Sequence, residues 1–150
     1  MNDKFTILLA EDDANDVYFV KKALHRADIH NPVQVVRDGV QAIAYLRGEK
    51  EFADRQHFPM PKLLLLDIKM PKKNGLEVLE WLRSGGEEVG ALNRLPVIIM
   101  SSSSLQADID RAYDLGVNAY LIKPSAFNEL VETLKKTTDF WKDAAEHPSI

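Results

Sequence analysis

Apolar residues along the chain form five short continuous runs, separated by longer stretches with a different periodicity. The runs span residues 5–10, 32–36, 63–66, 97–100 and 119–122. Continuous apolar runs, unlike alternating ones, are typical of strands buried on both faces of a parallel sheet. We therefore expect five parallel strands at these positions.

After each run, apolar residues recur every three or four positions, which predicts an amphipathic helix. The predicted apolar faces comprise Val17, Val20 and Leu24; Val40 and Ile43; Leu76, Leu79 and Leu82; Ile109 and Ala112; and Phe127, Leu130 and Leu134. Asp38 is placed to cap the second helix, and the serine run 101–104 to cap the fourth. Strands that alternate with helices indicate an α/β fold with right-handed βα units, a doubly wound (βα)5 sandwich.

The length and composition fit one globular domain. The chain has 150 residues, of which 45% are apolar and 28% are charged. We expect a single domain over residues 1–150, with a core at about 5–146, a short tail at 147–150 and no output domain. No apolar stretch reaches the length of a membrane span and the first residues do not resemble a signal peptide, so we expect a cytoplasmic protein without membrane contact.

Several chemistries lack the residues that they need. The chain has no cysteine, which excludes disulfides, cysteine-ligated zinc and a thiol nucleophile. It has no P-loop, no G-x-G-x-x-G after the first strand and no G-x-S-x-G elbow. A net charge of −4 predicts no broad basic surface, so we expect no nucleic-acid partner.

Polar side chains follow four of the five predicted strands. Acidic residues 11–13 follow the first, Asp67 the third, Ser101 the fourth and Lys123 the fifth. Ligands of open parallel sheets bind at the carboxyl ends of the strands, where these side chains should meet. The sequence therefore predicts a polar site at this edge.

The acids of this edge predict a metal site. Asp12 and Asp67 would repel each other unless a proton or a cation lies between them. Oxygen ligands with open water positions suit Mg²⁺ better than a calcium cage. The alternative is that the acids cap the first helix and interact with its positive end. We adopt capping for Asp13 and Asp16, and metal binding for Asp12 with Asp67.

A carboxylate at the end of a buried strand can also act as a nucleophile and form an aspartyl phosphate. Phosphoryl transfer requires that charge on three phosphoryl oxygens be neutralised. The metal can serve one oxygen, Lys123 a second, and the Ser101 hydroxyl with the backbone N–H of Ser102 a third. We therefore predict that Asp67 is a phosphoacceptor. Taken by itself, Lys123 could instead be an ordinary surface lysine, and Ser101 could be a turn residue without a role in phosphoryl binding.

As a set, these residues resemble the receiver domain of two-component response regulators. The matching motifs are Glu11-Asp12, Asp67 followed by Met70-Pro71 and Asn74-Gly75, Ser101, and Tyr120 three residues before Lys123-Pro124. The resemblance covers about residues 5–146 and implies the flavodoxin-like strand order 2-1-3-4-5. Long connections before the third and fourth strands, and the stretch Asp139-Phe140-Trp141, are most similar to stand-alone regulators that partner bacterial phytochromes.

The resemblance implies a signalling phosphoacceptor that catalyses only its own phosphorylation and dephosphorylation, and no other enzyme activity. Asp67 would accept a phosphoryl group from a phosphohistidine of a sensor histidine kinase, such as a bacteriophytochrome. Glu11, Asp12, Asp67 and the backbone carbonyl of Lys69 would hold Mg²⁺, for which Mn²⁺ is a substitute.

The resemblance also implies a conformational switch. Ser101 and Tyr120 would move together and change the surface of the fourth helix, fifth strand and fifth helix. The peptide bond between Lys123 and Pro124 would be cis, which a tertiary amide permits at low cost.

Two aromatic residues at the end of the fifth helix predict a contact between copies of the chain. Trp141 continues the apolar face of that helix, whereas Phe140 points elsewhere, so both are candidates for a homodimer contact. The alternative is that Phe140 packs on a neighbouring loop.

Two other functions of the chain stay open. One is a degenerate receiver that acts only as a binding scaffold. The other is a flavodoxin-like cofactor carrier, although three acids occupy the position of its phosphate-binding loop.

Overall fold

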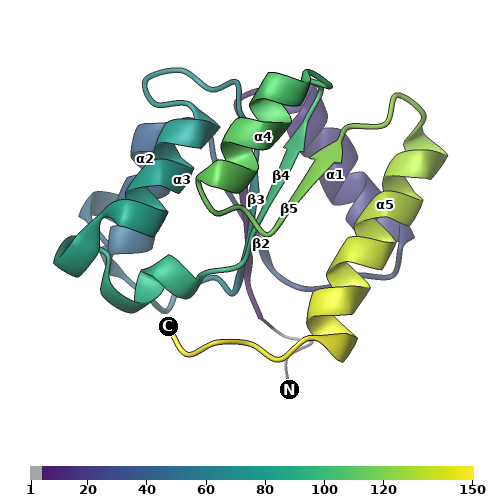
Figure 1. Cartoon of the computed structure of the whole chain (residues 1–150). Helices are drawn as coiled ribbons and strands as arrows, with labels where there is room; N and C mark the ends of the chain where they lie inside the picture. The colour runs from purple at the N-terminus through teal and green to yellow at the C-terminus, as the bar shows by residue number, and fades with distance from the viewer. Residues whose placement is uncertain (1–4) are drawn as a thin grey trace.

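A five-stranded parallel sheet lies at the centre of the computed structural model, which describes residues 5–150 (Figure 1). The strands are β1 (Ile7–Ala10), β2 (Val33–Val36), β3 (Leu63–Leu66), β4 (Val97–Ser101) and β5 (Ala119–Ile122). Their order is β2-β1-β3-β4-β5, and all neighbours are parallel. The predicted strands and strand order are confirmed.

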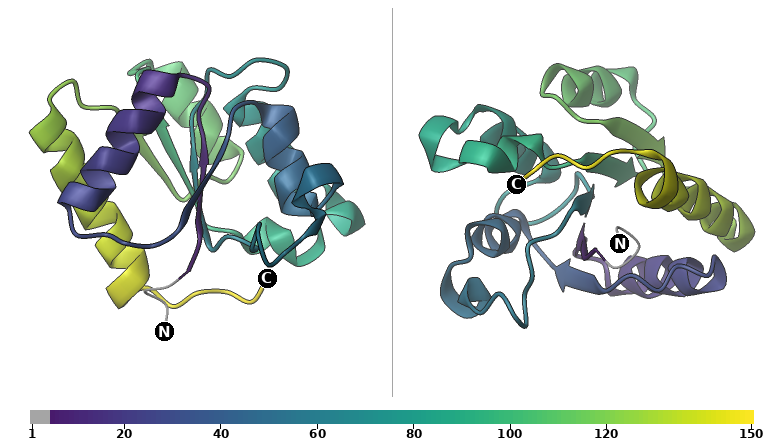
Figure 2. Two further views of the ribbon diagram at one scale, coloured as in Figure 1. Left: turned by 180° about the vertical axis from the view of Figure 1, so that it is seen from behind. Right: turned by 90° about the horizontal axis from the view of Figure 1, so that it is seen from below.

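Helices cover both faces of the sheet. The five α-helices are α1 (Ala14–Arg26), α2 (Gly39–Arg47), α3 (Gly75–Ser84), α4 (Gln106–Asp114) and α5 (Phe127–Asp139). Short helical turns are η2 (Lys50–Ala53), η3 (Gly86–Glu88), η4 (Gly90–Arg94) and the π-helical η5 (Phe140–Ala144). Helices α1 and α5 lie on one face and α2, α3 and α4 on the other (Figures 1 and 2). All five predicted helices are present.

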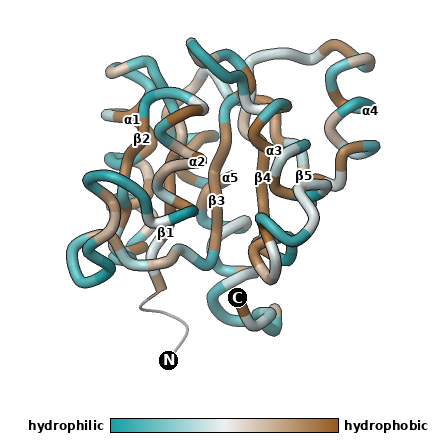
Figure 3. Tube along the Cα trace, turned by 90° about the vertical axis from the view of Figure 1, so that its left-hand side faces the viewer, coloured by the Kyte–Doolittle hydropathy of each residue, from teal (hydrophilic) through white to brown (hydrophobic). Residues whose placement is uncertain are grey.

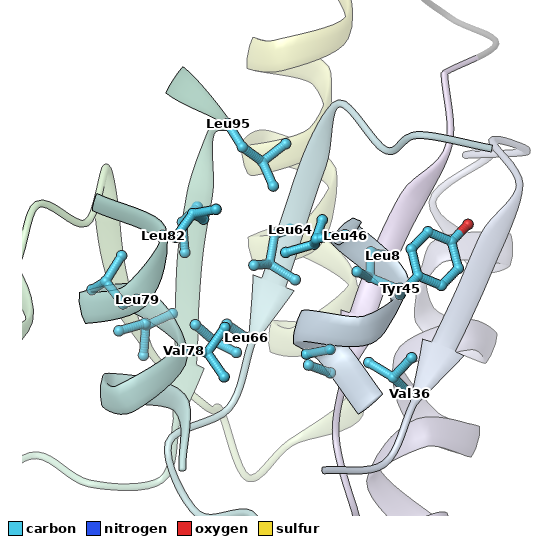
Figure 4. Packing of buried hydrophobic residues seen from close by; sticks show 14 of the residues in the cluster. Leu8, Val36, Tyr45, Leu46, Leu64, Leu66, Val78, Leu79, Leu82 and Leu95 are labelled. Carbon is cyan, nitrogen blue, oxygen red and sulfur yellow. The ribbon is translucent and has the colours of Figure 1, made fainter. Parts of the chain in front are cut away.

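The side chains of the strands pack into two hydrophobic cores, one on each face of the sheet. Leu8, Leu64 and Leu66 pack under α2 and α3, where Figure 4 shows them among buried helix residues. Ile7 and Leu65 point to the opposite side, against α1 and α5. Burial on both faces explains the continuous hydrophobic colour of β3 and β4 in Figure 3.

Two helices begin with the caps that the sequence predicts. The Asp13 carboxylate accepts the backbone N–H groups of Asn15 and Asp16 at 2.8 and 3.1 Å, so it caps α1. The Asp38 carboxylate accepts the Gln41 N–H at 2.7 Å and caps α2. Both caps are local interactions, which is why residue type and spacing were sufficient to predict them.

The starts of α3 and α4 differ from expectation. Helix α3 begins with an unpredicted capping box between Asn74 and Glu77. The predicted serine cap of α4 is wrong, because the N-cap is Leu105, whose side chain makes no capping hydrogen bond. The Ser103 hydroxyl instead donates to the Asp108 carboxylate at 2.5 Å, within the first turn of the helix.

The segment after η5 crosses the edge of the sheet at which the strands begin (Figures 1 and 2). The His147 ring packs on Phe5 with a centroid distance of 5.0 Å. The Arg94 guanidinium donates to the Ser149 carbonyl at 3.2 Å. The tail therefore joins α5 to the connection before β4. Between residues 5 and 150, no helix combines the length and hydrophobicity needed to cross a bilayer.

Candidate functional site

Backbone hydrogen bonds between neighbouring strands place the polar residues that follow the strands side by side at the carboxyl edge of the sheet. The Asp67 N–H donates to the Ala10 carbonyl at 3.0 Å, so Asp67 lies beside the acids that follow β1. The Lys123 N–H donates to the Ser101 carbonyl at 2.8 Å, which extends the pairing of β4 with β5. The parallel register thus gathers at one edge the four groups that follow separate strands.

Three of the predicted acids form a cluster. Glu11, Asp12 and Asp67 each offer a carboxylate oxygen, and these oxygens lie within 4.8 Å of one another. Glu11 and Asp67 are 2% and 8% exposed, whereas Asp12 faces solvent. The Asp67 carboxylate accepts the Ile68 N–H at 2.8 Å, and that of Glu11 accepts the Asp13 N–H at 3.1 Å. The backbone therefore orients both buried acids.

The Lys123 amine lies among three carboxylates. Its Nζ donates to Glu11 Oε1 at 2.6 Å, Asp16 Oδ2 at 2.9 Å and Asp67 Oδ2 at 3.3 Å. The side chain is 16% exposed, so this ammonium group replaces lost solvation with charged hydrogen bonds. A surface role for Lys123 is thereby excluded.

The site contains more carboxylates than the single ammonium group of Lys123 can neutralise. Burial raises the pKa of Glu11 to about 7; hydrogen bonds from Lys123 and the Asp13 N–H oppose this effect, and the Asp67 charge adds to it. Burial lowers the pKa of Lys123, but hydrogen bonds to Glu11 and Asp16 outweigh it and raise the pKa overall. The lysine stays charged, and the acids around it outnumber it.

The cluster fits a divalent cation. The three oxygens converge from two strands, and their donor chemistry is that of hard ions such as Mg²⁺ or Mn²⁺. A bound cation would favour the ionised form of Glu11, whose burial otherwise favours the protonated form.

Tyr120 links β5 to the loop between β4 and α4. Its hydroxyl donates to the Ser103 carbonyl at 2.9 Å, and its backbone N–H donates to the Tyr113 hydroxyl at 3.3 Å. Ser101 is 1% exposed, and its hydroxyl accepts the Ser103 N–H at 3.1 Å. Ser101 and Tyr120 thus contact the same loop residue.

The structure corrects two sequence predictions. None of the peptide bonds in residues 5–150 is cis, so the predicted cis bond before Pro124 is wrong. The trans form of an X–Pro bond is favoured by about 0.5–1 kcal/mol, and nothing in the dipeptide itself reverses this preference.

The second correction concerns Asp16, for which the sequence predicts only a role at the start of the first helix. Its carboxylate also forms an ion pair with Lys123. No local pattern signals this pair, because its two members are 107 residues apart in the chain.

Fold and site together define a class of protein: the chain belongs to the response regulator receiver domain family, whose model matches residues 7–135. Among curated proteins, it is 32% identical to response regulator Rcp1 of Synechocystis sp. over 143 residues, which cover 95% of this chain and 92% of Rcp1. Members of this family are signalling proteins, and the chain is accordingly a two-component response regulator.

Solved structures give the same relationship. The phosphorylated cyanobacterial phytochrome response regulator RcpA matches with a TM-score of 0.86 and 38% identity, over 97% of this chain and 99% of RcpA. RPA3017, a response regulator in red light signalling of R. palustris, matches with a TM-score of 0.89 and 36% identity, over 97% and 99%. The Mn²⁺-bound form of Rcp1 matches with a TM-score of 0.82 and 32% identity, over 97% and 99%. The resemblance to phytochrome response regulators therefore extends over nearly the whole chain.

Proposed function

We propose that Asp67 accepts a phosphoryl group from the phosphohistidine of a sensor histidine kinase. The observation that carries the proposal is the convergence of three carboxylates and the Lys123 amine at one sheet edge. An Asp67 oxygen would attack phosphorus, the P–N bond would break, and the leaving imidazole would retain its electron pair and take up a proton. The similarity to RcpA and RPA3017 supports a phytochrome-type kinase as the donor.

A divalent cation would take part in the transfer. Glu11, Asp12 and Asp67 would hold Mg²⁺ together with the backbone carbonyl of Lys69, and the cation would neutralise charge on a phosphoryl oxygen. Manganese is a reasonable substitute, because Rcp1 has been crystallised with Mn²⁺.

The remaining polar groups would bind the phosphoryl group. Lys123 would pair with one oxygen, while the Ser101 hydroxyl and the Ser102 N–H would bind another. Lys123 already lies 3.3 Å from Asp67 Oδ2, so a short movement would complete the contact. The protein supplies position and charge, which are what phosphoryl transfer chiefly requires.

Phosphorylation would then change the surface formed by α4, β5 and α5. Ser101 would move toward the phosphoryl group, and Tyr120 would follow because both contact Ser103. The side chains of Leu105, Tyr113 and Ile122 expose apolar area on or beside α4 and β5. This surface, together with Phe140 and Trp141 of η5, would present the signal to a partner or to a second copy of the chain.

The test is phosphorylation by acetyl phosphate with Mg²⁺, followed by intact mass spectrometry and peptide mapping. Wild type should gain one phosphoryl group within the peptide that contains Asp67, and the gain should disappear when Mg²⁺ is removed by a chelator. Asp67→Asn should remain folded and unlabelled. Asp110→Asn, which changes an exposed acid of α4, should be labelled like wild type.

Two results would contradict the proposal. Full labelling of Asp67→Asn would show that another residue is the acceptor. A wild-type protein that binds Mg²⁺ but takes up no phosphoryl group from any donor would support the scaffold function instead.

A further inference from the structure

Asp16 is a carboxylate of the site that belongs neither to the metal cluster nor to the acceptor. It lies in the first turn of α1, and its side chain is 43% exposed. Its Oδ2 accepts a hydrogen bond from Lys123 Nζ at 2.9 Å, which is shorter than the 3.3 Å between Lys123 Nζ and Asp67 Oδ2. In this structure, the lysine is therefore bound more closely to α1 than to the acceptor.

The donors of Lys123 are fully used. An ammonium group has three N–H donors, and here they serve Glu11, Asp16 and Asp67. A phosphoryl group brings additional charge and acceptor oxygens, so the amine would gain by moving toward it. One of the existing bonds must then weaken.

The partner that is released at least cost is Asp16. Glu11 is 2% exposed and makes the shortest of the three bonds to Lys123, at 2.6 Å, so water cannot readily replace the lysine there. The side chain of Asp16 is partly exposed, and water can replace the lysine there. Competition for Lys123 is thus between Asp16 and the phosphoryl group.

The position of the pair gives this competition a structural consequence. Asp16 and Lys123 lie on the wall of a cavity of about 500 Å³ between α1 and the start of α5. Phe19, Pro124 and Phe127 also line it. The ion pair joins α1 to the loop that follows β5, and its weakening would loosen that connection.

We propose that Asp16 is a positioning residue that holds Lys123 toward α1 in the unphosphorylated protein and competes with the phosphoryl group for its amine. This role rests on the proposed function of Asp67 and Lys123. The Asp16–Lys123 pair would stabilise the unphosphorylated form relative to the phosphorylated form. Phosphorylation would then have to break this pair.

The first test measures binding of beryllium trifluoride, an anionic analogue of the phosphoryl group, at saturating Mg²⁺. Asp16→Asn should bind it about twofold to fivefold more tightly than wild type, which corresponds to the loss of one partly exposed ion pair. Asp13→Asn is the matched control, because it removes the same charge from the same end of α1, keeps a capping side chain and does not contact Lys123. Fluorine NMR or calorimetry gives the dissociation constants.

The second test needs no metal or phosphoryl analogue. Limited acetylation of the metal-free protein, followed by peptide mapping, reports how readily the Lys123 amine reacts. The amine should react faster in Asp16→Asn than in wild type or Asp13→Asn, while exposed lysines such as Lys72 serve as internal references.

The outcomes separate the two proposals. If wild type binds no beryllium trifluoride, the proposed phosphoacceptor function fails, and the role of Asp16 fails with it. If wild type binds the analogue but Asp16→Asn binds no more tightly than Asp13→Asn, only the role of Asp16 is overturned. Equal acetylation of Lys123 in all three proteins would likewise contradict the role of Asp16.

Discussion

At the scale of single residues, Tyr45 shows how one side chain fixes a long connection. It is 1% exposed, its hydroxyl donates to the Pro59 carbonyl at 2.8 Å, and its ring packs 5.1 Å from that of Phe52. Arg55 donates to the Tyr45 carbonyl at 2.8 Å. The connection between α2 and β3 is therefore packed onto the end of α2.

Tyr45→Phe should lower the free energy of unfolding by about 1 kcal/mol, because the hydrogen bond to Pro59 is lost while the ring remains. Urea denaturation near pH 8 measures this difference. Tyr18→Phe, at a site that is 58% exposed, is the control and should be neutral.

Burial also makes the contribution of Tyr45 to the free energy of unfolding depend on pH. Burial raises the pKa of Tyr45 from 10.0 to about 12, against a lowering effect of Arg55. A raised pKa contributes stability that is complete below pH 10 and is lost as the pH rises toward 12. The stability difference between wild type and Tyr45→Phe should therefore narrow over this range. An unchanged difference at pH 11 would contradict the assignment of the raised pKa to this tyrosine.

At the scale of secondary-structure elements, Arg83 connects helix α3 to two neighbouring segments of the chain. Its guanidinium donates to the carbonyls of Asn93, Gly116 and Leu95 at 2.7, 2.8 and 2.9 Å, and to Asn118 Oδ1 at 3.0 Å. Burial lowers the pKa of Arg83. The side chain thus ties the end of α3 to η4 and to the turn before β5.

Arg83→Ala should destabilise the domain by about 2–4 kcal/mol, because four acceptors lose a charged donor at once and one of them, the Leu95 carbonyl, is partly buried. Arg111→Ala is the matched control, since its 3.9 Å pair with Glu80 joins two half-exposed side chains and should contribute under about 1 kcal/mol. Thermal and urea unfolding give both values. Equal effects of the two changes would show that the Arg83 contacts add no more stability than a surface ion pair.

At the scale of the whole molecule, the aromatic pair at the start of η5 is the candidate contact between copies. Phe140 is 53% exposed and meets the Trp141 ring edge-on at a centroid distance of 5.3 Å, while Trp141 itself packs against the core under α1 and α5. An exposed aromatic ring that contacts a partly buried one is an apolar anchor for a second surface. We therefore retain Phe140 and Trp141 as the proposed homodimer contact.

Phe140→Glu should shift the chain toward the monomer without unfolding it, because it places a charge in the apolar contact. Sedimentation velocity over a concentration series, with and without beryllium trifluoride, measures the shift. Tyr18→Glu changes an equally exposed aromatic on α1 and should leave the association unchanged. A wild-type chain that stays monomeric at high concentration in both states would rule out the contact.

Local features of the sequence were sufficient for most of the framework. The run Leu63-Leu64-Leu65-Leu66 predicted a doubly buried strand, and Asp38 predicted a helix start, because strand burial and helix caps depend on residues that are near each other in the chain. The rule that ligands bind at the carboxyl ends of strands then placed Asp67 and Lys123 at one edge. Motif resemblance added Glu11, whose carboxylate lies in the cluster.

Contacts between distant segments were decided only by the tertiary structure. Asp16 and Lys123 are 107 residues apart, and their pair exists because α1 packs beside the loop that leads into α5. Arg83 and Tyr45 find their acceptors on segments whose paths no local pattern specifies. Residue type and spacing determine which groups can donate, accept or be buried, whereas the packing of helices and loops determines which of these groups meet.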